Sequence, residues 1–98
     1  YHEITLYCRV HRNEVERVFS TLSYFDAMNL VTSASCPALI SIGMHDPVCP
    51  PDTIFAMRNN YAGKVDTTIY EYNTHEGGSV AHQLVQAQWL KALLEKSK

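Results

Sequence analysis

Apolar and polar positions change their period along the chain, and these changes mark the elements that it is expected to form. Residues 13–22 predict a helix, because four large apolar residues share one face at the i, i+3, i+4, i+7 spacing: Val15, Val18, Phe19 and Leu22. Asn13 is suited to cap the start of this helix. A second short helix is predicted over residues 24–31, whereas residues 1–12 show only a weak helical pattern.

Two later segments predict strands. Residues 38–43 are an almost continuous apolar run, which is typical of a parallel strand covered on both faces. Residues 67–72 alternate between two sets of side chains, with Tyr70 and Tyr72 on the same face, and this alternation predicts a strand near the edge of the sheet. We interpret these two tyrosines as packing residues rather than as a platform for a substrate.

A helix is expected after each strand. Pro51 suits the first position of a helix that should end near residues 60–63, and Ser79 is expected to cap a helix that runs to about Lys96. Strands that alternate with helices predict the α/β class, here two parallel strands flanked by helices. A two-stranded sheet is marginal by itself, so we expect further strands or a second chain to cover it.

The composition indicates a globular domain and excludes several classes of partner. The chain is 46% hydrophobic and 18% charged, and its net charge of −2 includes no basic stripe that would bind nucleic acid. No apolar run reaches the roughly 18 residues that span a bilayer, so no membrane partner is expected. Three cysteines, Cys8, Cys36 and Cys49, lie outside any C-x-x-C pair and indicate the reduced thiols of a cytoplasmic protein.

Asp46 and His75 form the pattern with the clearest chemistry. Asp46 follows the predicted strand that ends at Gly43, and His75 follows the one that ends at Tyr72. Reactive groups of open α/β sheets gather in the loops at the carboxyl ends of strands, and neighbouring strands are only about 4.8 Å apart. A carboxylate that accepts a hydrogen bond from Nδ1–H of a histidine leaves Nε2 free to take up a proton. An acid followed by a histidine is also the chain order of the α/β-hydrolase triad.

Each candidate also has a simpler interpretation. Asp46 before Pro47 is typical of an Asx-turn, and His75 of a histidine in a surface loop. The stretch Gly77-Gly78-Ser79-Val80-Ala81 is similar to the nucleophile motif G-x-S-x-G. However, six residues separate Ser79 from the preceding strand, so we favour a helix cap over a nucleophile at this position.

Metal-ligating residue types occur near the same two loops, namely His45, Asp46, Cys49 and His75. Three prolines between residues 47 and 51 prevent the helical i, i+4 spacing of many metal sites, and no second cysteine pair supports a structural zinc. The sequence therefore predicts no metal ion.

Two segments and one dipeptide carry a resemblance to a known family. Residues 22–30 read LSYFDAMNL, residues 41–51 read SIGMHDPVCPP, and His75-Glu76 follows after the second strand. Together these stretches resemble the acetyl xylan esterase / cephalosporin C deacetylase family of α/β-hydrolases, along nearly the whole chain. In that family the acidic member of the triad lies in the Ile-Gly-x-x-Asp-x-Val-x-Pro-Pro stretch, which falls here on Asp46. The catalytic histidine lies in the His-Glu pair, which falls here on His75.

The resemblance implies a Ser-His-Asp esterase that removes acetyl groups from acetylated sugars, xylo-oligosaccharides or cephalosporins. Such enzymes are commonly cytoplasmic, need no cofactor and often form homo-oligomers such as hexamers.

The resemblance also bears on how much of an enzyme the chain represents. The chain begins at Tyr1 without an initiator Met, and no nucleophile motif precedes Asp46. We therefore expect residues 1–98 to be the C-terminal portion of a single α/β-hydrolase domain, inactive alone because the serine and the oxyanion-hole donors lie outside it. A non-catalytic assembly module and a shortened reading frame are the alternative interpretations.

Overall fold

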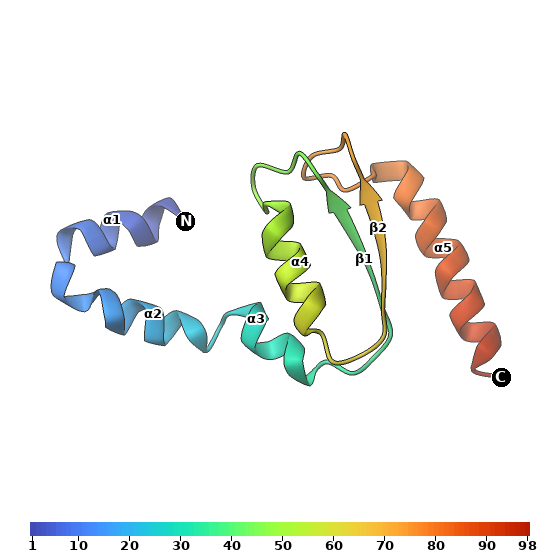
Figure 1. The fold of residues 1–98 in the computed structure, drawn as a ribbon, viewed down its shortest axis with the longest axis horizontal. Coiled ribbons are helices and arrows are strands. Elements are labelled where there is room, and N and C mark those ends of the chain that lie inside the picture. The colour runs from blue at the N-terminus through green and yellow to red at the C-terminus, as the bar shows by residue number, and fades with distance from the viewer.

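A two-stranded parallel sheet lies at the centre of the structure, a computed structural model that describes residues 1–98 (Figure 1). Strand β1 (Ala38–Gly43) pairs with strand β2 (Val65–Tyr70), with Gly43 opposite Tyr70. The predicted bounds of β1, residues 38–43, are confirmed. Helices cover both faces of this strand, which agrees with its apolar run. The α/β class and the parallel pairing are confirmed as well.

Strand β2 begins and ends two residues earlier than the sequence predicts. The alternation over residues 67–72 continues past Tyr70, but β1 turns away after Gly43 and offers no further backbone for pairing. Tyr72 therefore lies in the following loop, where its side chain is 82% exposed. The prediction that Tyr70 and Tyr72 share a strand face is wrong, since the end of the partner strand decides where β2 ends.

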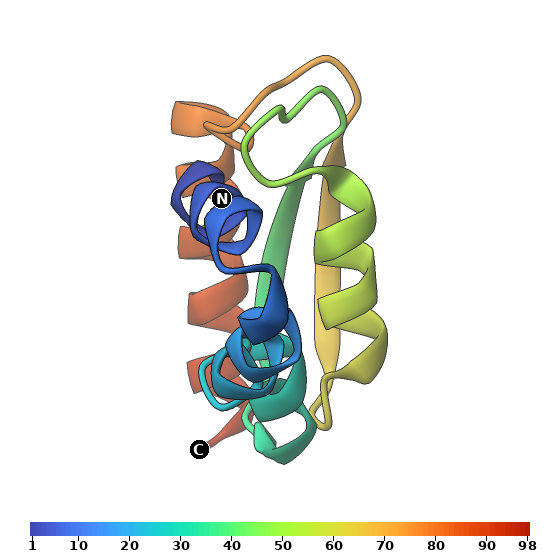
Figure 2. The same cartoon turned by 90° about the vertical axis from the view of Figure 1, so that its left-hand side faces the viewer.

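Helices cover the two faces of the sheet. Helix α4 (Pro51–Asn60) lies on one face and helix α5 (Ser79–Lys96) on the other, as Figure 2 shows. Helix α4 starts at Pro51, which confirms the prediction. Proline suits the first helical position because a backbone N–H there would have no hydrogen-bond partner within the helix. Trp89 joins α5 to β2, since its Nε1–H donates a hydrogen bond to Asp66 Oδ2 over 2.7 Å. None of the helices is both long and apolar enough to cross a lipid bilayer.

Two predicted helix caps are wrong. Helix α5 begins at Ser79 itself, Gly78 is its cap residue, and no side chain accepts a capping hydrogen bond there. Gly78 has φ 93° and Ser79 has φ 45°, so the backbone enters the helix by a left-handed turn and the Ser79 hydroxyl lies beyond the cap position. Helix α2 (Val15–Ser23) begins after the 3₁₀ turn η1 (Arg12–Glu14), which contains Asn13 and moves the helix start past it.

The N-terminal helices extend away from the sheet as an arm (Figure 1). Helix α1 (His2–Val10) forms despite its weak pattern, and α2 follows it. The predicted second helix is shorter than expected, consisting of α3 (Ala27–Leu30) followed by the 3₁₀ turn η2 (Val31–Ser33). Asp26 caps α3, because its Oδ1 accepts a hydrogen bond from Met28 N–H over 3.0 Å.

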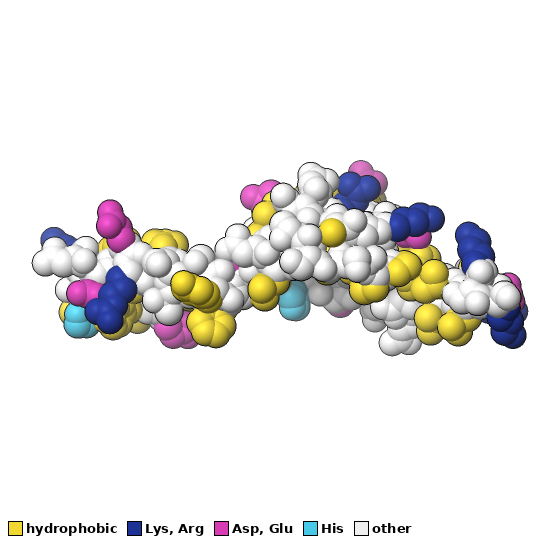
Figure 3. Space-filling model, turned by 90° about the horizontal axis from the view of Figure 1, so that it is seen from below, with side chains coloured by type: hydrophobic (Ala, Val, Ile, Leu, Met, Phe, Trp, Pro, Cys, Tyr) yellow, Lys and Arg dark blue, Asp and Glu magenta, His cyan; other side chains and the backbone are white.

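The hydrophobic core is small. Ile42 in β1 is the only apolar side chain that is fully buried, at 1% exposure. The Cα radius of gyration is 17.0 Å, above the roughly 13 Å of a compact domain of this length. Hydrophobic side chains are visible at several places on the surface (Figure 3). The exposed large apolar residues include Phe19 in α2 and Leu84 and Leu94 in α5. The two strands and five helices therefore leave much apolar surface without a packing partner.

Candidate active site

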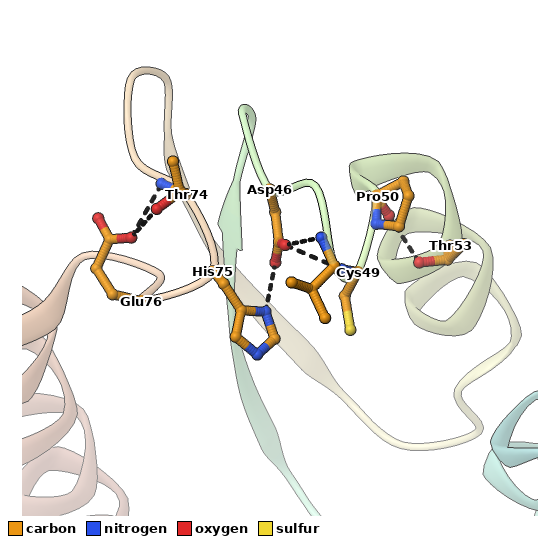
Figure 4. Close-up of polar contacts among 8 residues, drawn as sticks. Asp46, Cys49, Pro50, Thr53, Thr74, His75 and Glu76 are labelled. Carbon is orange, nitrogen blue, oxygen red and sulfur yellow. Dashed lines mark hydrogen bonds and ion pairs between the residues drawn. The ribbon is translucent and has the colours of Figure 1, made fainter. Parts of the chain in front are cut away.

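The loops that follow β1 and β2 lie side by side at the carboxyl edge of the sheet (Figure 4). Backbone hydrogen bonds join them, since Met44 N–H donates to Tyr70 O and His45 N–H donates to Asn73 O, both over 3.0 Å. Gly43 permits this close approach, because a side chain at this position would overlap the backbone of Thr74. The loop after β1 and the loop after β2 are thus fixed to each other before any side chain is considered.

Asp46 uses its two carboxylate oxygens for different tasks. Oδ1 accepts hydrogen bonds from Val48 N–H over 2.8 Å and from Cys49 N–H over 2.9 Å, which is the Asx-turn that the sequence also suggests. Oδ2 lies 3.0 Å from His75 Nδ1. The Asx-turn therefore orients the carboxylate toward the histidine. Asp46 forms the turn and contacts His75 at the same time, so the two interpretations of this residue are compatible.

His75 comes from the loop after β2 and meets Asp46 across the strand ends, as the order of the strands predicts. Its Nδ1 faces the carboxylate, while Nε2 points away from Asp46 and has no hydrogen-bond partner in the chain (Figure 4). The His75 side chain is 59% exposed, whereas that of Asp46 is 10% exposed. An ionised Asp46 selects the tautomer with a proton on Nδ1, so Nε2 is left as a base that is open to solvent.

The surroundings of Asp46 favour its ionised form. Burial alone would raise the pKa of its carboxyl group, but hydrogen bonds from Cys49 N–H, His75 and Val48 N–H together hold the pKa below its ordinary value of 3.8. Asp46 is therefore a carboxylate at neutral pH and can offset positive charge on His75.

Glu76 holds the turn that carries His75. Its Oε2 accepts hydrogen bonds from Thr74 N–H over 3.1 Å and from the Thr74 hydroxyl over 2.5 Å, and its Oε1 accepts one from Asn73 Nδ2 over 2.6 Å. These donors lower the pKa of Glu76 from 4.5 to about 2. From the sequence alone Glu76 is only the second residue of the His-Glu pair. The signal for its supporting role is that Asn73 and Thr74, whose side chains can donate hydrogen bonds, lie within three residues of its carboxylate.

A buried histidine fixes the other end of the same loop. The Tyr70 hydroxyl lies 3.0 Å from His82 Nδ1, and His82 is only 6% exposed. The contact joins the end of β2 to the first turn of α5. Gly78 lies against the Tyr70 ring, where any side chain would overlap it. His82 could not be found from the sequence, because the apolar residues of α5 spread around the helix and mark no buried face.

The remaining candidates lie in different positions. His45 stacks against Tyr72, with ring centroids 6.4 Å apart, and takes no part in the Asp46 contact. Ser79 is the first residue of α5, and its hydroxyl makes no hydrogen bond with His75. Cys49, in contrast, lies close to the pair, because the ligand atoms of Asp46, Cys49 and His75 are all within 4.8 Å of one another. Helical spacing is not needed for this convergence, because a turn and a neighbouring loop bring the three atoms together.

The chain is similar to known esterases along most of its length. The sequence model of the acetyl xylan esterase (AXE1) family matches residues 1–93. The acetyl esterase Axe7A of Xylanibacter ruminicola is 30% identical over an alignment of 86 residues, and the match covers 83% of this chain and 19% of that protein. The chain thus spans about a fifth of the length of this relative.

Two solved structures share the fold. The acetyl xylan esterase from Paenibacillus sp. R4 superposes with a TM-score of 0.87 at 34% identity, over 94% of this chain and 30% of that one. Acetyl xylan esterase 1 from Thermoanaerobacterium sp. JW/SL YS485 gives a TM-score of 0.76 at 38% identity, over 89% of this chain and 28% of that one. Both are α/β-hydrolases. The match across residues 1–93 shows that the chain belongs to the acetyl xylan esterase family.

Proposed function

We propose that this chain supplies the acid and the base of a Ser-His-Asp triad in an esterase that removes acetyl groups from acetylated carbohydrates. The observation that carries the proposal is the 3.0 Å contact between His75 Nδ1 and Asp46 Oδ2, with Nε2 of the same ring free. Membership of the acetyl xylan esterase family supports the acetyl ester as the substrate class. Acetylated xylo-oligosaccharides are the substrates we favour, and cephalosporins are a second class to test.

In the proposed reaction His75 first acts as a general base. Nε2 takes the proton of a serine hydroxyl as the serine oxygen attacks the acetyl carbonyl, and Asp46 stabilises the imidazolium through Nδ1–H. The protonated ring then gives its proton to the leaving sugar oxygen, so an acetyl-serine remains. Water repeats the same sequence and releases acetate. Asp46 stays ionised throughout, which agrees with the direction in which its pKa is shifted.

The nucleophilic serine and the oxyanion-hole donors are proposed to lie outside these 98 residues, in the complete enzyme. The isolated chain is then expected to hydrolyse p-nitrophenyl acetate negligibly, because an imidazole without a nucleophile and oxyanion donors gives little acceleration. Robust turnover by the chain that disappears in Ser79→Ala would instead identify Ser79 as a nucleophile.

The test of the proposed role is His75→Ala in the complete enzyme. The expected result is a fall in kcat on the order of 10⁴–10⁶-fold, because the serine loses its base. His45→Ala is the matched control, since His45 lies on the same edge but stacks on Tyr72 and is expected to keep most of the activity. Near-normal acetyl-ester turnover by His75→Ala would overturn the assignment.

A non-catalytic assembly module is the second candidate function, and the exposed apolar surface favours it. Phe19 is 62% exposed and Leu84 is 66% exposed, on elements at opposite ends of the chain. In this alternative the chain binds a partner through these surfaces and the free strand edges. Sedimentation of the chain distinguishes the two functions. Defined complexes, together with no esterase activity in any longer form of the protein, would support the module. A monomer that unfolds cooperatively would contradict it.

A further inference from the structure

Three side chains with different metal-binding atoms converge beside the proposed catalytic pair. A carboxylate oxygen of Asp46, the sulfur of Cys49 and a ring nitrogen of His75 all lie within 4.8 Å of one another. Figure 4 shows the Cys49 side chain extending along the same side of the loop as the His75 ring. In a tetrahedral zinc site such atoms are about 3.3–3.7 Å apart, so closing the cluster requires shifts of only about 1 Å.

The backbone around the cluster prepares the carboxylate for a third partner. Both hydrogen bonds from the Asx-turn, those of Val48 N–H and Cys49 N–H, go to Asp46 Oδ1. Oδ2 therefore remains available to the ring of His75 or to a cation. The same turn places Cys49 three residues from Asp46, and its thiol is free rather than in a disulfide. Oδ1 is thus held by the fold, which is the orienting support that metal-ligating carboxylates commonly have.

We propose that Asp46, Cys49 and His75 bind one Zn²⁺ ion, and that the ion is a reversible inhibitor of the esterase. One thiolate, one imidazole and one carboxylate are a donor set that suits zinc, with the fourth position left for water. On binding, the Cys49 thiol gives its proton to solvent. The ring proton moves from Nδ1 to Nε2 as the Nδ1 lone pair turns to the metal.

Inhibition follows from this change in the ring, and this part rests on the proposed function. With a proton on Nε2 and the metal on Nδ1, His75 has no lone pair with which to accept the proton of a serine. Asp46 is at the same time occupied by the metal and no longer stabilises an imidazolium. A single ion therefore disables both residues of the pair.

The binding test uses the complete enzyme and Co²⁺, whose absorption reports its ligands, because the 98 residues alone leave many large apolar side chains exposed. Titration is expected to produce a thiolate-to-cobalt charge-transfer band and the visible bands of a tetrahedral ion, and both should disappear when Zn²⁺ is added. Cys49→Ser should remove the charge-transfer band and weaken binding more than about tenfold. The matched control is Cys36→Ser, which changes an exposed thiol elsewhere and should leave the spectrum intact. No charge-transfer band, or one that persists in Cys49→Ser, overturns the site.

The inhibition test measures acetyl-ester hydrolysis by the complete enzyme with and without Zn²⁺. For each variant, the rate with Zn²⁺ is divided by the rate without it. The wild type is expected to lose activity in Zn²⁺ and to recover it on chelation, while Cys49→Ser should be inhibited at least about tenfold less strongly. Equal inhibition of the two overturns the regulatory role. A complete enzyme without esterase activity would refute the proposed function instead, and the cobalt spectrum would still decide whether the metal site exists.

Discussion

The carboxyl edge of the sheet and the outer surfaces of the helices differ in how far the chain completes them. At the edge, Asp46, Glu76 and the buried His82 each have hydrogen-bond partners in the chain. On the outer surfaces, large side chains such as Leu84 and Leu94 are more than half exposed. The comparison shows that short-range contacts between two loops can orient the Asp46–His75 pair, whereas a hydrophobic core needs more chain than these residues provide.

After the loss of His75, the largest expected effect comes from removing the charge at the carboxyl edge. Asp46→Asn in the complete enzyme keeps the shape of the side chain but should reduce kcat by about 10⁴-fold, because the amide favours the wrong tautomer of His75. Asp52→Asn is the control, since Asp52 lies in the first turn of α4 and is not paired with a histidine. Steady-state kinetics measure both, and equal activity of the two variants would remove Asp46 from the mechanism.

Gly43→Ala tests whether the joining of the loops matters. The added methyl group would overlap the backbone of Thr74, so the loops must separate and Asp46 should move away from His75. We expect a fall in kcat of about 10²-fold, the usual cost of misplacing a catalytic group by about 1 Å. Gly63→Ala is the matched control, because it meets the backbone of Cys36 at the opposite end of the strands and should cost stability without changing kcat.

Glu76→Gln tests the support of the His75 turn. The amide that replaces one oxygen faces donors of Asn73 or Thr74, so the turn should loosen, with a fall in kcat of about tenfold and little change in KM. Glu71→Gln makes the same change at an exposed position two residues before the turn and should be silent. If both variants behave like the wild type, Glu76 has no positioning role.

Acidification should loosen this turn before the rest of the chain. Because folding lowers the pKa of Glu76 from 4.5 to about 2, its contribution to stability is present above pH 4.5 and is lost as the pH falls toward 2. Asp46 acts in the same direction, since its pKa is also lowered. The protection factor of the Thr74 amide, which compares its exchange rate with that of an unstructured peptide at the same pH, should therefore fall over this range, and Glu76→Gln should flatten that dependence.

The smallest expected effect lies on the exposed surfaces. Leu84→Lys in the isolated chain should change the free energy of unfolding by less than about 0.5 kcal/mol, because the side chain is already 66% exposed. In the complete enzyme the same change should cost more than about 2 kcal/mol if further chain covers α5. Gln88→Lys, at an exposed polar position of the same helix, is the control in both melts. Equal costs of Leu84→Lys in the two proteins would mean that α5 stays uncovered.

The sequence predicts those features that depend on neighbouring residues. The apolar run of β1, the start of α4 at Pro51 and the order of Asp46 and His75 at the strand ends are all local patterns, and the structure has each of them. Family resemblance adds the His-Glu pair but not the contacts that Glu76 makes.

Features that depend on a distant partner could not be predicted in this way. The end of β2 is decided by where β1 stops, and the position of Ser79 in α5 by the left-handed turn before it. The Tyr70–His82 contact joins a strand to a helix, and the approach of Cys49 to His75 joins two loops. In each of these cases the deciding residue lies on another element, which no periodic pattern records.

The tautomer of His75 tests the central claim most directly, because it reports the Asp46 contact without depending on turnover. Nitrogen-15 NMR of the imidazole ring in the complete enzyme at neutral pH should show a proton on Nδ1 and none on Nε2 for the neutral ring. Asp46→Asn should shift the ring toward the Nε2–H form. A His75 ring that carries its proton on Nε2 in the wild type, or that does not respond to Asp46→Asn, would contradict the proposed acid–base pair.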